Sequence, residues 1–317
     1  MKEYNRISVV LCTYNGEKYL KEQIDSILTQ TYPIYELIVQ DDCSTDRTAS
    51  IVKAYMAHDD RVKLFVNSIS QGFNYNFSSA FNKATGNYIA SSDQDDIWEE
   101  NKLERMLLNI GNSRMVFHNS MLFTDVPSNK LGAKNPANSV VNELYFLLKP
   151  YIPGHECFFH RDLLPLYNQV VLRERNVSYD SLISLVAEVA GGVTFLDENL
   201  VLWRRHSKAT SYQSGRTYSS NLNGLLLAVK ALTSSQSRET TRRYFQAVSC
   251  LPFKQKCTQE IVRLMSKGTL RGIIQSCYIC QKNYALLYPH ISPERARVKA
   301  FFTPLYFLRD SSVFIIK

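Results

Sequence analysis

Three carboxyl groups lie close together in the segment Asp93-Gln94-Asp95-Asp96. Carboxylates this close repel one another, and a bound divalent cation relieves that repulsion. A set of oxygen ligands suits Mg²⁺ or Mn²⁺, which keep part of their water shell and take further oxygens from phosphate groups. The alternative is a solvated turn in which Asp96 caps the next helix. The position of the cluster directly after a predicted strand favours the metal site.

A second acidic pair, Asp41 and Asp42, follows another predicted strand. A carboxylate here can accept a hydrogen bond from a pyrimidine N3–H or from a ribose hydroxyl, because buried polar groups need partners. An Asx turn ahead of Ser44 is the alternative. The local sequence leaves both readings open.

Two common phosphate-binding motifs are missing from the sequence. Thr13-Tyr14-Asn15-Gly16 follows the first predicted strand, where a dinucleotide-binding enzyme carries Gly-x-Gly-x-x-Gly. The chain also has no Walker A motif. These observations argue against a dinucleotide-dependent oxidoreductase and against a P-loop enzyme.

The elements that position the acidic residues alternate between strands and helices. Apolar, β-branched runs predict strands at 7–12, 37–40, 62–66, 88–90 and 115–118. Apolar residues at helical spacing predict helices between these strands. This order indicates an α/β fold with a doubly wound, mostly parallel sheet. Both acidic clusters then lie beyond the carboxyl ends of strands, where such sheets bind ligands.

The rest of the chain divides into a continuation and a basic tail. Residues 126–139 read as a surface loop, and a helix that is apolar nearly all round begins at Tyr179-Asp180 and ends at Gly191-Gly192. Two short strands are predicted at 193–196 and 200–203. We therefore predict one domain over 1–215, with halves 1–125 and 126–215, and a basic, aromatic-rich helical extension over 216–317.

Charge is distributed unevenly along the 317 residues. The net charge is +8, but residues 216–317 carry 16 basic and 4 acidic residues, a net +12, while residues 1–215 carry −4. Cations interleaved with Leu, Phe and Tyr suit the headgroup zone of an anionic membrane. Solvated helices packed on the first domain are the alternative. No nucleic-acid-binding motif accompanies the basic tail, so we expect no nucleic-acid partner.

The sequence also predicts a location. No apolar run approaches the roughly 20 residues of a spanning helix. The seven cysteines are irregularly spaced, which is typical of reduced thiols. We expect a cytoplasmic protein attached peripherally to the inner face of the cell membrane.

Three segments occur in order over about the first 120 residues: SVVLCTYNGEKYLKEQIDSILTQTY, ELIVQDDCSTDRT and GNYIASSDQDDIW. They resemble family 2 glycosyltransferases, and most closely the bacterial rhamnosyltransferase-like group. A weaker continuation covers GHECFFHRDLL and SYDSLISLVAEVAGGVTFLDENLVLWRRHSKATS. The resemblance implies a GT-A fold and inverting transfer from a nucleotide-diphosphate sugar.

The resemblance also implies roles on the nucleotide side. It implies that the nucleotide is lined by Thr13, Tyr14 and Asn15. Asp42 would contact the pyrimidine base, and Asp93 the ribose and diphosphate. One departure lies beside Asp42, where Cys43 replaces the family's usual glycine.

Further roles concern the reacting groups. Asp95 and His206 would hold Mn²⁺ or Mg²⁺, and Arg204 and Arg205 would face the leaving diphosphate. Asp180 matches the general base, which must take a proton because an acceptor hydroxyl is a poor nucleophile. Glu156 is the next candidate for the base.

The sequence therefore predicts an enzyme, an inverting and metal-dependent hexosyl or deoxyhexosyl transferase. Its expected donor is a UDP- or dTDP-sugar, with dTDP-rhamnose among the candidates, and its expected acceptor is a lipid-linked saccharide of bacterial capsule or O-antigen synthesis. One alternative is a catalytically silent nucleotide-sugar-binding module on the same fold. A sugar-nucleotide pyrophosphorylase is another, but it needs a Gly-rich basic loop near the N-terminus.

Overall fold

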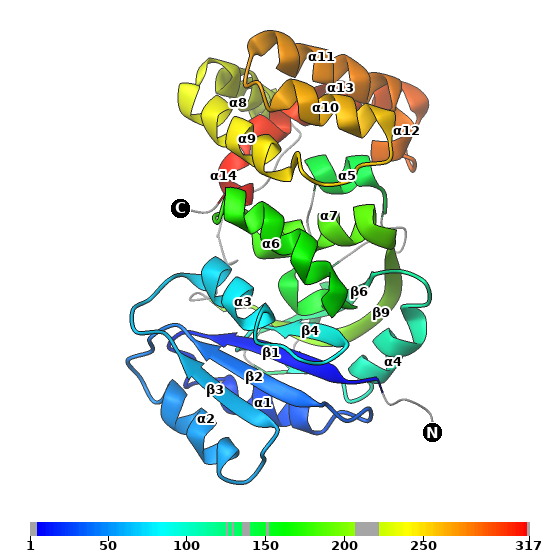
Figure 1. Ribbon diagram of the computed structural model, residues 1–317. Coiled ribbons are helices and arrows are strands. Elements are labelled where there is room, and N and C mark those ends of the chain that lie inside the picture. Colours follow the sequence, from blue (N-terminus) through cyan, green and yellow to red (C-terminus); the bar gives the residue numbers. More distant parts are fainter. Residues whose placement is uncertain are drawn as a thin grey trace. The chain divides into compact units, whose positions relative to one another are not determined.

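The computed structural model describes residues 5–124, 126–128, 130–134, 140–149, 152–206 and 222–315 (Figure 1). The chain forms two compact units. The sheet unit comprises Met1–Ser139, Ile152–Leu164 and Gly191–Gln213, and the helical unit comprises Val140–Tyr151, Pro165–Ala190 and Ser214–Lys317. The domain boundary expected at residue 215 lies in 207–221, outside the described residues. Residues 165–190 group with the C-terminal helices.

The sheet unit is an α/β structure built on one nine-stranded sheet. Its strand order is β3-β2-β1-β4-β8-β6-β9-β5, and β7 pairs with β6. The pairs β3/β2, β2/β1 and β1/β4 are parallel, whereas β8 runs antiparallel to both β4 and β6. The strands are β1 (Ile7–Thr13), β2 (Glu36–Asp41), β3 (Val62–Val66), β4 (Tyr88–Ser92), β5 (Ile97–Trp98), β6 (Met115–Phe123), β7 (Lys130–Ala133), β8 (Cys157–His160) and β9 (Val193–Arg204).

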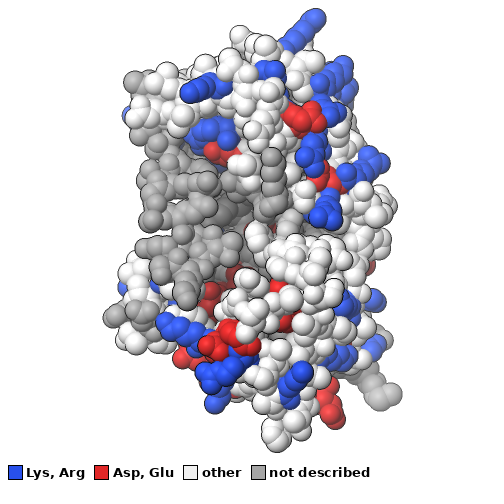
Figure 2. All heavy atoms as spheres, turned by 90° about the vertical axis from the view of Figure 1, so that its left-hand side faces the viewer, with Lys and Arg blue, Asp and Glu red and all other residues white. Residues whose placement is uncertain are grey.

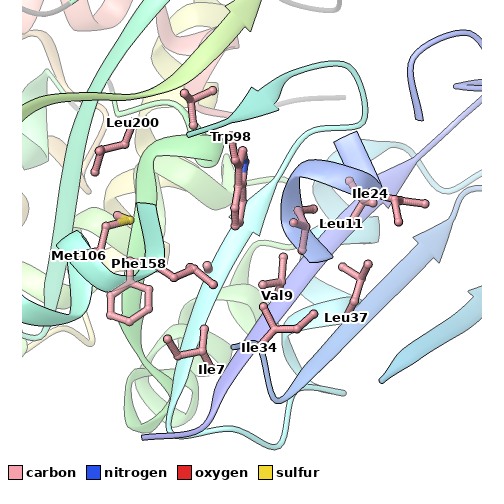
Figure 3. Close-up of a cluster of buried hydrophobic side chains, with 14 of the residues drawn as sticks. Ile7, Val9, Leu11, Ile24, Ile34, Leu37, Trp98, Met106, Phe158 and Leu200 are labelled. Carbon is pink, nitrogen blue, oxygen red and sulfur yellow. The ribbon is translucent and has the colours of Figure 1, made fainter. Parts of the chain in front are cut away.

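Helices cover the sheet and bury the apolar faces that the sequence predicts. They are α1 (Leu20–Leu28), α2 (Thr48–Met56), α3 (Phe73–Phe81) and α4 (Lys102–Asn109), and a short 3-10 turn spans Gly154–Glu156. All seven residues of β1 are buried, as expected of a strand covered on both faces. Figure 3 shows Val9, Leu11 and Leu37 of β1 and β2 packed with Ile24 of α1 and with Trp98. This core fixes the strand ends from which the acidic loops emerge.

Two predictions about the later strands are wrong in detail. Part of the expected loop 126–139 is the strand β7, which pairs with β6. The two strands expected at 193–196 and 200–203 are one strand, β9, whose pairing with β6 shifts register around Asn119. At the polar interruption between them the pairing with β6 skips Asp197 and Glu198, and extra residues of this kind can be left unpaired without ending the strand.

The helical unit consists of helices in its described residues. These are α5 (Glu143–Leu148), α6 (Leu164–Arg173, which begins at the unit boundary), α7 (Tyr179–Gly191), α8 (Leu222–Thr233), α9 (Ser235–Val248), α10 (Lys256–Met265), α11 (Leu270–Lys282), α12 (Tyr284–Leu287), α13 (Pro293–Arg309) and α14 (Ser311–Phe314). Gly192 follows α7 with a φ of 100°, a conformation that glycine adopts without strain. In the described part of the chain, no helix has the length and apolar character needed to cross a bilayer.

Candidate functional site

The order of the strands reverses between β1 and β4, which makes this place the switch point of the sheet. The residues predicted to bind the nucleotide follow the strands there. From β1 the chain crosses to β2 on one side, and β4 lies on the other. Both pairings are parallel, so the carboxyl ends of β2, β1 and β4 lie at the same edge. A ligand site is expected at such a switch point.

Side chains join the three loops that leave this edge. The side-chain amide of Gln94 accepts from the N–H of Tyr14 at 2.9 Å and donates to the carbonyl of Tyr14 at 3.1 Å. The Ser44 hydroxyl accepts from the N–H of Asn15 at 2.8 Å, and the Asn15 side chain accepts from the N–H of Thr45 at 2.8 Å. Asn15 has a φ of 48°. The Tyr14 side chain is left half exposed, at 51%, beside this connected set of loops.

Asp41 and Asp42 are both buried and have different partners. Asp41 accepts from the Thr13 hydroxyl at 2.8 Å, and also from Ser44. Asp42 accepts four hydrogen bonds, from the side chains of Asn67 and Ser70 and from the N–H groups of Gln71 and Gly72. Burial acts to raise the pKa of Asp42, but these bonds outweigh it and lower that pKa.

Four donors fill the acceptor capacity of a carboxylate. Asp42 therefore holds the loop 67–72 in place, and its predicted contact with the base requires one of these donors to give way. Cys43, which replaces glycine, has a φ of 63°. That left-handed conformation explains why a glycine suits this turn.

Asp95 and His206 are brought together although 111 residues separate them. The Nε2 atom of His206 lies 2.8 Å from Oδ2 of Asp95, and each side chain is 17% exposed. The ring of Tyr19 lies 5.2 Å from that of His206. The side chains of Asp95 and His206 can thus be reached from solvent. A metal ion that both of them bind, and a diphosphate bound to that ion, would need this access.

Arg204 supports the acidic loop from inside the sheet unit. Its guanidinium, in a side chain 2% exposed, donates to the carbonyl of Asp95 at 2.8 Å and to the carboxylate of Glu22. Its N–H donates to Asp96 at 3.0 Å. The Arg205 guanidinium, which is less buried, lies over the ring of Trp203.

Asp93, Asp96 and His155 form a second group that could hold a cation. The Nδ1 atom of His155 lies 3.3 Å from Oδ2 of Asp93 and 3.5 Å from Oδ2 of Asp96. Asp96 and His155 are fully buried, and Oδ2 of Asp96 has no hydrogen-bond partner among the residues that the structure describes. The carboxylates of Asp93 and Asp96 therefore bring negative charge into a poorly solvated part of the protein.

Burial therefore shifts the pKa of every acid in this loop upwards. It raises the pKa of Asp93 to about 6, against the opposing charge of Lys102. Burial and the charge of Asp93 raise the pKa of Asp95, and burial raises that of Asp96 well above its ordinary value. Burial also lowers the pKa of His155 to about 3. A bound cation would offset this cost.

Lys102 lies at the start of α4 and is fully buried. Its ammonium donates to the carbonyl of His155 at 2.7 Å and lies 3.6 Å from the centre of the Trp98 ring. Burial lowers its pKa to about 7, although the charges of Asp96 and Glu156 oppose that shift. Lys102 could not be recognised from the sequence, because a lysine that follows Glu99 and Glu100 at a helix start has the pattern of a solvated surface residue.

Glu156 and Asp180 are the two candidates for the base. Glu156 is fully buried, accepts from the Ser120 hydroxyl at 2.7 Å and lies 3.4 Å from the ammonium of Lys134. Asp180 belongs to the helical unit, in the first turn of α7, where it accepts from the Ser178 hydroxyl and from the N–H of Ser181. The buried Glu156 is the less suitable group for meeting an acceptor.

Removing the charge of Asp93 is expected to stabilise the metal-free protein. Because the pKa of Asp93 is raised in the folded protein, its ionised form destabilises the folded state. Stability is therefore highest below the pKa that this carboxyl has in the unfolded chain, and it falls as pH rises through about 6. Asp93→Asn removes the loss, which we place at about 1 kcal/mol because solvent reaches the side chain, or roughly 2–4 °C. Thermal unfolding in EDTA should show the gain at pH 7.5 and little at pH 4.5. A variant less stable at both pH values would contradict this reading.

A doubly wound sheet with an acidic loop and a histidine at its switch point defines an α/β protein with a candidate ligand site at that edge. The sequence profile of glycosyl transferase family 2 matches residues 8–166, which is half of the chain. The chain belongs to glycosyl transferase family 2.

The curated relatives agree with this assignment. The Escherichia coli protein WfgD, named as a UDP-Glc:alpha-D-GlcNAc-diphosphoundecaprenol beta-1,3-glucosyltransferase, is 36% identical over 134 residues, which are 39% of this chain and 52% of WfgD. The chain spans about half or less of the length of the curated relatives it matches.

Two solved structures share the fold. Residues 1–349 of TarS from S. aureus, in complex with UDP, align over 97% of this chain and 91% of that one, with a TM-score of 0.57 and 15% identity. The mannosyltransferase PcManGT from Pyrobaculum calidifontis, in complex with GDP-Man and Mn²⁺, aligns over 98% and 87%, with a TM-score of 0.53 and 16% identity. At this identity the likeness concerns the fold, and it confirms the predicted GT-A architecture.

Proposed function

We propose that the protein is an inverting glycosyltransferase that moves a sugar from a UDP- or dTDP-sugar to a hydroxyl of a lipid-linked saccharide in bacterial surface polysaccharide synthesis. The observation that carries the proposal is the Asp95–His206 pair, which lies beside the switch point of a family 2 domain. The UDP bound to TarS and the diphosphoundecaprenol in the name of WfgD support this donor and acceptor class. A dTDP-rhamnose donor follows only from the sequence resemblance.

The loops at the switch point would bind the nucleotide. Tyr14 offers an exposed ring against which a base can pack, and Asn15 and Thr13 hold the turn that carries it. Asp42 would lie beside the base and fix loop 67–72. Asp93, with its side chain 38% exposed, is accessible to the ribose and diphosphate.

The chemistry of the donor atoms fits Mn²⁺ or Mg²⁺. Carboxylate oxygens suit both ions, and an imidazole nitrogen favours Mn²⁺. Asp95 and His206 would hold the ion because they are the partly exposed pair, and the buried His155, which lies beside both Asp93 and Asp96, would orient Asp93. When bound, the ion supplies positive charge that stabilises the leaving diphosphate.

The remaining steps fall to residues of the chain itself. Arg205 would add a fixed cation near the diphosphate, and Arg204 would act through Asp95, whose carbonyl it binds. Asp180 would accept the proton of the acceptor hydroxyl as that oxygen attacks the anomeric carbon. One base opposite the leaving group gives attack in line and inversion of configuration.

Two other functions fit part of this structure. A catalytically silent binding module would retain the nucleotide loops and need no base. A sugar-nucleotide pyrophosphorylase would need a basic, Gly-rich loop after β1, where this chain has Thr13-Tyr14-Asn15-Gly16. Neither accounts for the retained acidic loop and Asp180 together.

UDP with Mn²⁺ should raise the melting temperature of the protein, and UDP alone should do so less. A ligand present at 100 times its dissociation constant stabilises the folded state by about 2.7 kcal/mol, or several degrees. Thermal shift assays with UDP, dTDP and GDP rank the nucleotides, and transfer assays with a lipid-pyrophosphate acceptor then separate an enzyme from a binding module. No shift with any nucleotide would contradict the proposed function.

A further inference from the structure

An exposed apolar stripe runs along α11 in the helical unit. Leu270, Ile274 and Tyr278 are 50%, 47% and 54% exposed, and their spacing of four residues places them on one face of the helix. The neighbouring face of α11 is anchored in the unit, because Ile273, Cys277 and Cys280 are buried. The stripe is therefore a surface of a firmly packed helix.

α13 extends this surface. The ring of Tyr278 lies 5.2 Å from that of Phe301, in an edge-to-face contact between the two helices. Val298, one turn before Phe301, is 57% exposed. Leu270, Ile274, Tyr278 and Val298 thus form one apolar patch across two packed helices, which we call the α11–α13 face.

The segment of the chain that carries this face has charges of one dominant sign. Between residues 267 and 299 the chain has six basic residues and a single acidic one, Glu294. The basic residues are all exposed: Lys267, Arg271, Lys282, Arg295, Arg297 and Lys299. Figure 2 shows, on the side it presents, that Lys and Arg also predominate elsewhere on the helical unit.

We infer that the α11–α13 face docks on an anionic lipid bilayer, the apolar patch entering the headgroup zone and the surrounding cations meeting the lipid phosphates. The inference rests on the proposed function, because a lipid-linked acceptor places the reaction at a membrane. Apolar side chains flanked by cations are the composition of a peripheral membrane-binding surface. A second copy of the chain is a poorer occupant, since pairing this face with itself would oppose six cations to six.

The test is co-sedimentation of the full chain with vesicles of phosphatidylglycerol and phosphatidylcholine, and with phosphatidylcholine alone, across a salt series. The test variant is Ile274→Ser with Arg271→Glu. Its matched control is Leu172→Ser with Arg173→Glu on α6, where Leu172 is 86% exposed. Each basic residue near the surface contributes about five-fold to partitioning, so the charge reversal should weaken binding to anionic vesicles roughly 20-fold or more.

Salt-sensitive binding by the wild type and the control, with loss in the test variant, supports the inference. The inference would be overturned if the wild type did not bind vesicles or if both variants bound equally. It would also be overturned if light scattering showed a dimer that only the test variant loses, because the face would then pair two copies of the chain. Both variants change exposed positions, so their melting temperatures should match the wild type. The UDP-dependent thermal shift of the wild type is measured in parallel. If the wild type bound vesicles but showed no thermal shift with UDP, the result would count against the proposed function alone.

Discussion

Asp95→Asn is expected to lower transfer at least about 10³-fold and to abolish the gain in UDP affinity that Mn²⁺ provides. The substitution keeps the size of the side chain and removes the charge that pairs with His206. An amide oxygen is a much weaker ligand for a divalent cation than a carboxylate is. Stabilisation of a leaving diphosphate by a bound ion is worth several kcal/mol, which sets the size of the effect.

Isothermal titration with UDP, with and without Mn²⁺, measures the binding part of this prediction. Asp60→Asn is the matched control, because Asp60 is an exposed acid in the same unit. His206→Ala should weaken the dependence on Mn²⁺ while leaving metal-free UDP binding intact. Metal-dependent transfer that persists in Asp95→Asn would remove Asp95 from the metal site.

The first half of the sheet unit could be predicted from sequence because its strands are continuous apolar runs. β1, β2 and β4 begin and end within two residues of the expected positions. The acidic loops follow these strands directly in the sequence, so predicting where the strands end also predicts where the acidic residues lie. The meeting of Asp95 with His206 needed the family resemblance, since no local pattern relates residues so far apart.

Other features depend on tertiary packing and left no local signal. Lys102 is buried beneath the acidic loop, where its charge partly balances those of Asp93 and Asp96. Such a position is set by α4 packing on the sheet and not by the residues adjacent to Lys102. His155 was visible in the motif Gly154-His155-Glu156, but its contact with two carboxylates depends on β8 pairing with β4.

Asp180→Asn is expected to lower the rate of transfer by about 10²-fold or more while leaving UDP binding and stability nearly unchanged. A general base contributes roughly 10²–10⁴-fold to a proton-transfer step, and an amide cannot take the proton. The structure also gives Asp180 a second role, because it accepts from Ser178 and Ser181 in the first turn of α7. Asparagine keeps an acceptor oxygen at this place, so the substitution separates the two roles.

The structural cost of Asp180→Asn should be small. Loss of a negative charge near a helix N-terminus costs about 0.3–1 kcal/mol, which shifts the melting temperature by a few degrees at most. Single-turnover transfer and UDP titration together distinguish a slow chemical step from weak donor binding. If rate, donor affinity and melting temperature all fall together, Asp180 serves α7 alone. Glu156→Gln is then the next substitution to test. We expect Glu156 to be structural, because it forms an ion pair with Lys134.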